Sequence, residues 1–166
     1  VFLQKTKTGR TITKLVTIHE EVKQVGNSQR YYLPNKYHLV GRSDESNAEF
    51  WQRVDTKITE LYGQRDKSNP LKVYVHGDGA FWIKAGTDYV PNSYFILDKY
   101  HFMKELSKVA GYEPTYSNLL HDAIYSFDRK KIQDILEIFV NSEICAAEEA
   151  DRFYRYYANN EQGIHI

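Results

Sequence analysis

The stretch VYVHGDGAFWIKAG, residues 73–86, determines how the rest of the chain is interpreted. It begins as a β-strand, with the apolar side chains of Val73 and Val75 at alternating positions. It then presents one carboxylate, Asp78, between two glycines. Because glycine has no Cβ, a phosphate or a metal ion can approach the backbone closely on both sides of this acid. The pattern predicts a functional acid at the tip of a core strand.

A second predicted strand ends in the same way. Residues 93–98, SYFILD, follow a Pro-Asn turn and finish at Asp98. In an α/β sheet, acids at the carboxyl ends of neighbouring strands meet at one edge, where sites are usually built. Mg²⁺ binds one or two carboxylates together with waters and substrate phosphates. Two such ions about 4 Å apart assist phosphoryl transfer.

Ordinary structural roles compete with this hypothesis. An aspartate in a glycine-flanked turn usually bonds its own backbone, which would make Asp78 a turn residue. Asp98 is favoured as the N-cap of the helix that follows it. His101 comes three residues later, so its imidazole can meet Asp98 on the first helical turn. The residues alone leave the role of Asp78 open.

The N-terminal part predicts strands and one helix. Residues 14–22 and 36–40 are typical of strands, and VFLQ at the start is a further strand candidate followed by a KTGR turn. Capping-box spacing between Ser46 and Glu49 predicts a helix, and Gly63 is a good end for it. The residues QRDKSNP are expected to form a loop before the strand at 71–76.

From His101 onward the periodicity is helical. The expected helices are 101–111, 117–127, one capped by Asp128 and one capped by Ser142. We therefore predict an α/β fold with two domains. Residues 1–100 would form an incomplete mixed sheet with a packed helix, and residues 101–166 a helical region.

Composition limits the function. The chain has 166 residues, 42% of them hydrophobic, which suits a folded domain. No apolar run approaches the roughly 20 residues that cross a bilayer, so we expect no membrane association. A single cysteine, Cys145, excludes internal disulfides and fits a cytoplasmic location. The 22 basic and 22 acidic residues argue against a self-sufficient nucleic-acid binder.

Two basic clusters could nevertheless touch DNA. The first is Arg129-Lys130-Lys131, and the second is formed by Lys5, Lys7, Arg10 and Lys14. With zero net charge, a helix start and a solvated strand are the favoured explanations.

Four motifs between residues 74 and 106 resemble the core of bacterial insertion-sequence transposases of the ISLre type. They are Gly77-Asp78-Gly79-Ala80, Trp82-Ile83-Lys84, Pro91-Asn92-Ser93 and Leu97-Asp98-Lys99-Tyr100-His101. The resemblance implies an RNase H-like nuclease core of the DDE kind, related to Mutator-type transposases. Such an enzyme cuts transposon ends and joins them to target DNA, so double-stranded DNA, Mg²⁺ or Mn²⁺ and further copies of the chain are the implied partners.

The resemblance also implies roles for individual residues. Asp78 would be the second acid of the catalytic triad and a metal ligand. Asp98 and His101 would match a Cys/Asp-x-x-His signature in supporting roles. Lys84 could contact DNA phosphate, although an exposed lysine after a strand is more often only solvated. The helical region would be an insertion before the last acid.

The likeness is incomplete in one respect. The first acid of the family would precede Val1, and the third, a glutamate, would follow Ile166. The pairs Glu20-Glu21 and Glu148-Glu149 are expected to be solvated and not to replace them. We therefore expect an excised piece or a remnant of a broken element, inactive by itself.

Two other functions remain as alternatives. The chain could be a non-catalytic binding remnant that keeps the fold and has lost the chemistry. It could also be a phosphohydrolase with Asp78 as nucleophile, but this ranks low because Ala80 stands where a second acid is usual.

Overall fold

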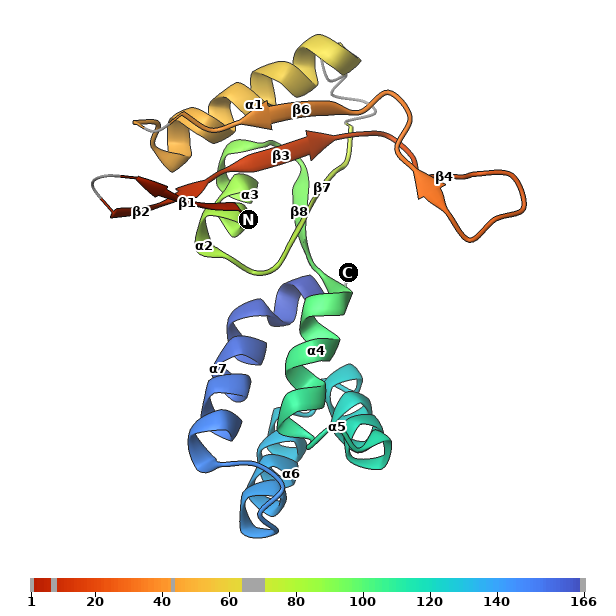
Figure 1. Cartoon of the computed structure of the whole chain (residues 1–166), viewed down its shortest axis with the longest axis vertical. Helices are drawn as coiled ribbons and strands as arrows, with labels where there is room; N and C mark the ends of the chain where they lie inside the picture. The colour runs from red at the N-terminus through yellow and green to blue at the C-terminus, as the bar shows by residue number, and fades with distance from the viewer. Residues whose placement is uncertain (1, 7–8, 43, 64–70, 165–166) are drawn as a thin grey trace. The chain divides into compact units, whose positions relative to one another are not determined.

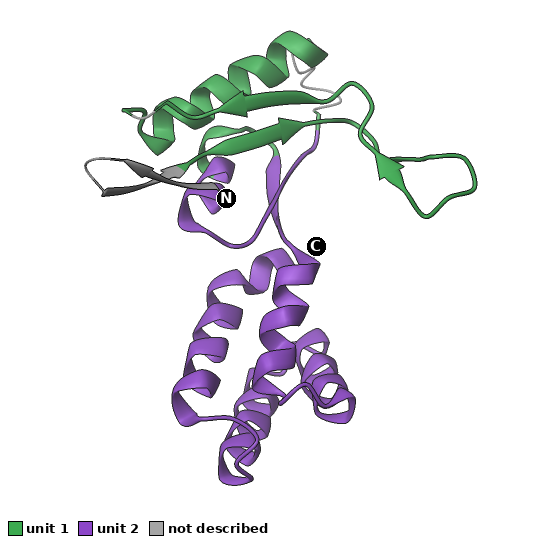
Figure 2. Cartoon of the chain, viewed as in Figure 1, with its two compact units in different colours: residues 1–71, 88–92 green, residues 72–87, 93–166 purple. Residues whose placement is uncertain are grey.

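The computed structural model describes residues 2–6, 9–42, 44–63 and 71–164. These residues form two compact units (Figure 2). Unit 1 contains residues 1–71 and 88–92, and unit 2 contains residues 72–87 and 93–166. The strand pair that carries Asp78 and Asp98 therefore lies in the same unit as the C-terminal helices. The domain boundary at residue 100 stays a prediction.

The described strands pair in twos (Figure 1). Three pairs are antiparallel, namely β1 with β2, β3 with β6 and β4 with β5, and one pair, β7 with β8, is parallel. The strands are β1 Phe2–Thr6, β2 Gly9–Thr13, β3 Leu15–Ile18, β4 Lys23–Gln24, β5 Tyr31–Tyr32, β6 Tyr37–Val40, β7 Val73–Gly77 and β8 Ser93–Leu97.

The helices are concentrated in the second half of the chain. They are α1 Asn47–Tyr62, α2 Phe81–Lys84, α3 Gly86–Tyr89, α4 Lys99–Val109, α5 Pro114–Tyr125, α6 Arg129–Asn141 and α7 Ala147–Ile164. Among the described residues, no helix combines the length and the apolar character that crossing a bilayer requires.

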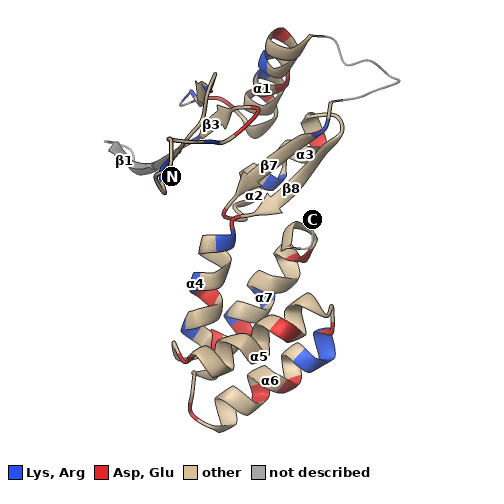
Figure 3. Cartoon of the chain, turned by 90° about the vertical axis from the view of Figure 1, so that its right-hand side faces the viewer, with Lys and Arg blue, Asp and Glu red and all other residues tan. Residues whose placement is uncertain are grey.

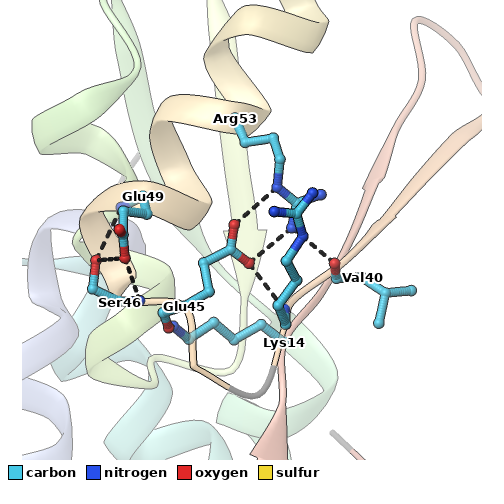
Figure 4. A network of polar contacts seen from close by, with 7 residues as sticks. Lys14, Val40, Glu45, Ser46, Glu49 and Arg53 are labelled. Carbon is cyan, nitrogen blue, oxygen red and sulfur yellow. Dashed lines mark hydrogen bonds and ion pairs between the residues drawn. The ribbon is translucent and has the colours of Figure 1, made fainter.

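In unit 1, a network of hydrogen bonds connects α1 to the residues that precede it (Figure 4). Arg53 donates to both carboxylate oxygens of Glu45, each at 2.8 Å, and to the carbonyl of Val40 at 2.9 Å. Ser46 and Glu49 form the predicted capping box, with the Glu49 N–H 3.2 Å from the Ser46 hydroxyl. A cap of this kind is worth about 1 kcal/mol.

Unit 2 has a helical core. Helix α4 packs against α5 and α7, and α6 packs against α5 and α7. Side chains at helical spacing fill the space between them, and the largest fully buried ones are Tyr157, Phe102, Phe139, Leu106, Leu120, Ile124 and Ile132. Helix α7 also lies against β8, where a Cβ on Gly163 would come within 2.5 Å of the Phe95 ring. This contact brings the helices to the strand pair.

Most predicted elements are confirmed. Helix α1 begins after Ser46 and ends at Gly63, and Asp128 caps α6 through the Lys131 N–H at 2.9 Å. The strand expected at 14–22 is shorter, since β3 ends at Ile18. The predicted KTGR turn includes residues 7–8, and the predicted QRDKSNP loop covers residues 64–70; both lie outside the described residues.

Some of the predicted helix boundaries were wrong. Ser142 does not cap the last helix but ends α6, and α7 begins at Ala147, where Glu149 accepts from the Ala146 N–H at 3.1 Å. Helix α5 begins at Pro114 instead of residue 117, because proline is preorganised for a first helical position. The short helices α2 and α3 were not predicted.

Candidate active site at the carboxyl edge of the parallel strand pair

Strands β7 and β8 bring the two predicted acids to one edge. They run parallel with Gly77 opposite Leu97, so that Asp78 and Asp98 are the next residue on each strand. The Asp98 N–H donates to the Gly77 carbonyl at 2.7 Å and continues the ladder past the last paired residues. The carboxyl edge of a parallel pair is the place where α/β proteins bind ligands.

The carboxylate of Asp78 bonds its own turn. Its Oδ1 accepts from the Ala80 N–H at 3.0 Å, which is the ordinary turn role that the sequence left open. Packing and backbone conformation explain why both residues that flank Asp78 are glycines. A Cβ on Gly77 would lie 2.8 Å from the Ile83 side chain, and Gly79 has φ +89°. The half-buried carboxylate is therefore held in a turn that only glycine neighbours allow.

Asp98 is the N-cap of α4, as favoured from the sequence. Its Oδ1 accepts from the His101 N–H at 2.9 Å and lies 3.2 Å from the His101 Nδ1. The backbone N–H of His101 is the main reason that the pKa of Asp98 is lowered. The structure thus brings Asp98 and His101 together, with the His101 side chain 53% exposed.

Two residues of α7 that the sequence did not single out contact the Asp78 turn. The Tyr156 hydroxyl donates to the Asp78 carbonyl at 3.4 Å. Burial, followed by the charges of Asp78, Glu105 and Asp98, raises the pKa of Tyr156 to about 12. One helical turn later, the Asn160 amide lies against Gly79, where an added Cβ would be 2.5 Å from Asn160 Oδ1.

Asn160 is unusual in its surroundings. It is a polar residue that is only 4% exposed. Its Nδ2 donates to the Tyr156 carbonyl at 2.8 Å, while its Oδ1 is buried without a hydrogen-bond partner. The sequence did carry a signal, because Asn160 continues the apolar spacing of Ala150, Phe153 and Tyr157 along α7.

Lys84 points to a different place from the two acids. Its Nζ donates to the Asn159 carbonyl at 2.9 Å, and it lines a cavity of about 540 Å³ together with Thr87, Ser93, Arg129 and residues 158–163 of α7. A structural role for Lys84 is therefore visible, and its contact with DNA stays a prediction.

Arg129, from the predicted basic cluster, has a local acidic partner. Its guanidinium pairs with Glu161, which raises the pKa of Arg129, and the buried Tyr157 hydroxyl donates to Glu161 at 2.6 Å. Lys130 similarly lies 3.3 Å from Asp134. Figure 3 shows acidic and basic residues mixed on α4, α6 and α7. In the second cluster, Lys14 donates to the Glu45 carbonyl at 2.9 Å.

The glutamates considered as substitute acids are all exposed. Glu21 lies beyond β3 and pairs with Lys23 at 2.7 Å, and Glu148 and Glu149 lie in the first turn of α7. In unit 2, Glu148 and Glu149 lie at the opposite end of α7 from Asn160, the residue that lies against Gly79.

The donors at this edge match a hard divalent cation in kind, since Asp78 and Asp98 offer carboxylate oxygens. They do not amount to a complete cage. Within the described ranges, no group of three or more His, Cys, Asp or Glu side chains could hold a metal ion. Further ligands would have to be waters, substrate phosphates or other parts of a longer protein.

A family model described as "Uncharacterised protein family (UPF0236)" matches residues 1–166. The chain is also similar to UPF0236 proteins of Caldanaerobacter subterraneus subsp. tengcongensis. One, whose name combines many loci from TTE0033 to TTE2212, is 32% identical over 157 residues, which cover 92% of this chain and 32% of the relative. UPF0236 protein TTE2489 is 31% identical over 157 residues, with the same coverage. UPF0236 protein TTE0402 is 31% identical over 157 residues, covering 92% of this chain and 30% of the relative.

The chain therefore spans about a third of the length of these curated relatives. No solved structure matches it. The extent of the family match, together with the identity to several members, establishes that the chain belongs to the uncharacterised protein family UPF0236.

Proposed function

We propose that the chain is part of the catalytic core of a metal-dependent DNA transposase with an RNase H-like sheet, in which Asp78 binds a divalent cation beside the scissile phosphodiester. The observation that carries the proposal is the position of the two acids. Asp78 and Asp98 each follow the last paired residue of one of two parallel strands, so both lie at the carboxyl edge of the pair. Asp98 and His101 would support the site, and Lys84 is a candidate for contact with DNA.

The names of the relatives add indirect support. One combines many loci of a single genome. Multiple copies of one coding sequence in a genome are what a self-copying DNA element leaves behind. A DNA element that encodes a binding protein without enzymatic activity would also be present at many loci. The names therefore support a mobile element as the origin of these genes, and they do not bear on its chemistry.

The chemistry follows from the residues. Bound Mg²⁺ or Mn²⁺ would polarise the phosphodiester and activate the attacking oxygen. Asp78 would hold the cation through its carboxylate, while the glycines beside it let the turn pack against Ile83 and Asn160. Since two or three carboxylates are the usual requirement, we propose that further acids come from outside this chain and that the chain alone is inactive.

The test uses a protein of the relatives' full length that contains this chain, assayed with transposon-end DNA. Asp78→Ala should reduce strand transfer by about 10³-fold or more, as expected when a catalytic group is removed, and leave DNA binding nearly unchanged. Glu148→Ala, an exposed acid on α7, serves as the matched control and should retain full activity. Full activity of the Asp78 variant would refute the proposal.

A non-catalytic remnant is the second candidate. Both acids have local structural partners, the Ala80 N–H for Asp78 and the His101 N–H for Asp98, so their presence does not require a cation. Strand transfer by the full-length protein would exclude this candidate. Unchanged DNA or protein binding without any cleavage, in wild type and variant alike, would favour it.

A further inference from the structure

The unpartnered oxygen of Asn160 requires an explanation, because buried polar atoms without hydrogen bonds are rare in folded proteins. The orientation of the amide is fixed by its other end, since Nδ2 donates to the Tyr156 carbonyl. Oδ1 is the amide atom nearest to Gly79, since a Cβ on Gly79 would lie 2.5 Å from Oδ1 and 3.1 Å from Nδ2. The residue that it touches follows Asp78 directly and carries a backbone N–H.

The turn at Asp78 has a feature that complements this oxygen. In the structure, the Asp78 carboxylate is engaged by the Ala80 N–H of its own turn. A carboxylate that turns outward to a cation gives up part of this interaction, and the peptide groups of the turn must reorient. Gly79, with φ +89° and no side chain, is the residue at which such reorientation meets the least steric resistance.

We propose that Asn160 is a positioning residue for Asp78. Its buried oxygen accepts a hydrogen bond from the Gly79 N–H when the Asp78 carboxylate leaves its own turn to hold a divalent cation. The unpaired oxygen disfavours the resting turn, and its pairing favours the turn that binds the cation. This inference rests on the proposed function, because it takes the cation at Asp78 from there.

Helix α7 is suited to this role. Tyr156 and Asn160 lie one helical turn apart, and both reach the Asp78–Gly79 backbone. The same helix is held against β8 by the contact of Gly163 with Phe95 and Leu97. The amide is thus carried by a helix that packs closely against β8, and the inference takes its oxygen to stay in place while the turn changes.

The experiment titrates the 166-residue chain with Mg²⁺ alone and follows backbone amides in ¹H–¹⁵N spectra. Asn160→Leu removes the oxygen at similar volume. Its melting temperature in chelator should equal or exceed that of wild type, because an unpaired buried acceptor is gone, while its affinity for Mg²⁺ should fall about tenfold. A tenfold change corresponds to about 1.4 kcal/mol. The Gly79 amide proton should shift downfield with Mg²⁺ in wild type and not in the variant.

Three further variants keep the result interpretable. Asn160→Ala replaces Asn160→Leu if the latter does not fold, with the same loss of affinity but a lower melting temperature. Asn160→Asp keeps an acceptor oxygen and should bind Mg²⁺ at least as tightly as wild type. Asn159→Ala, at the exposed neighbouring position, should change neither quantity.

The outcomes separate the two proposals. If Asp78→Asn weakens Mg²⁺ binding while Asn160→Leu and Asn160→Ala bind like wild type, the positioning role is wrong and the proposed function stands. If Asp78→Asn leaves Mg²⁺ binding unchanged, the 166-residue chain holds no cation at Asp78 and the inference is overturned, whereas the proposed function is decided by the strand-transfer test of the longer protein. If Asn160→Asp binds as weakly as Asn160→Leu, the oxygen is not the acting group, and the inference is overturned.

Discussion

The hydroxyl of Tyr156 donates a hydrogen bond to the backbone carbonyl of Asp78; the two oxygens are 3.4 Å apart, and the two residues are 78 positions apart in the chain. The bond joins the last helix to the turn that contains the candidate catalytic acid. The following predictions test this connection and the packing around it.

Removing the Tyr156 hydroxyl should weaken the fold modestly. Tyr156→Phe leaves the partly buried Asp78 carbonyl without this donor, and we expect a loss of about 1 kcal/mol in the free energy of unfolding. Urea denaturation of the wild type and the variant measures it. Tyr154→Phe, on the same helix, is the control and should change stability less; equal effects of the two variants would contradict the role of the hydrogen bond.

Gly79→Ala should be among the most damaging single changes in unit 2. The new Cβ would lie 2.5 Å from Asn160 Oδ1, and φ is +89°. We expect a loss of about 3 kcal/mol, because a steric clash adds to backbone strain.

Two comparisons divide this loss into its causes. Gly63→Ala has a similar φ of +77° but nothing within 4 Å of the new Cβ, so it reports the backbone cost alone. The double variant Gly79→Ala/Asn160→Ala should be more stable than the sum of the single changes predicts. Simple additivity in the double-mutant cycle would show that the two residues do not touch.

Unit 1 should lose stability in acid through Glu45. Hydrogen bonds from Arg53 are the main cause that lowers the pKa of Glu45 from 4.5 to about 2. Since the folded pKa lies below the unfolded one, the stabilisation is present above about pH 4.5 and is lost as the pH falls toward 2. Unfolding free energies between pH 2 and pH 7 measure this loss. The difference in unfolding free energy between wild type and Glu45→Gln should become smaller as the pH falls from 7 to 2. A difference that stays constant would contradict the prediction.

Glu161 should matter more to stability than its cationic partner. Glu161→Ala leaves the buried Tyr157 hydroxyl without its acceptor, which costs about 1–3 kcal/mol. Arg129→Ala removes an exposed charge and should cost much less. Thermal unfolding of both variants gives the order, and a larger effect for Arg129→Ala would show that the ion pair dominates.

Local signals allowed much of the secondary structure to be predicted. The Ser46–Glu49 capping box, the cap at Asp128 and the two strands that end in acids depend on residues close in sequence, and all of them are present. The start of α7 was missed because Ser142 has the chemistry of an N-cap, although the preceding helix uses that position as its C-cap.

The supporting part of the candidate site depends on contacts that no local pattern contains. Tyr156 and Asn160 lie about 80 residues from Asp78, and their importance follows from the packing of α7 on the strand pair. Asn160 could have been noticed as a polar residue on an apolar helix face. Nothing in the sequence, however, places that face against Gly79.

The glycine at 163 has an evolutionary consequence. A Cβ there would lie 2.5 Å from the Phe95 ring and 3.0 Å from the Leu97 nitrogen, so any larger residue would push the last helix off the strand. Recombination between homologous genes can exchange the region around β8 without the region around α7. The β8 surface of one protein would then face the α7 surface of another, and the two would not fit. We expect these two stretches, which are separated by α4, α5 and α6, to be inherited together.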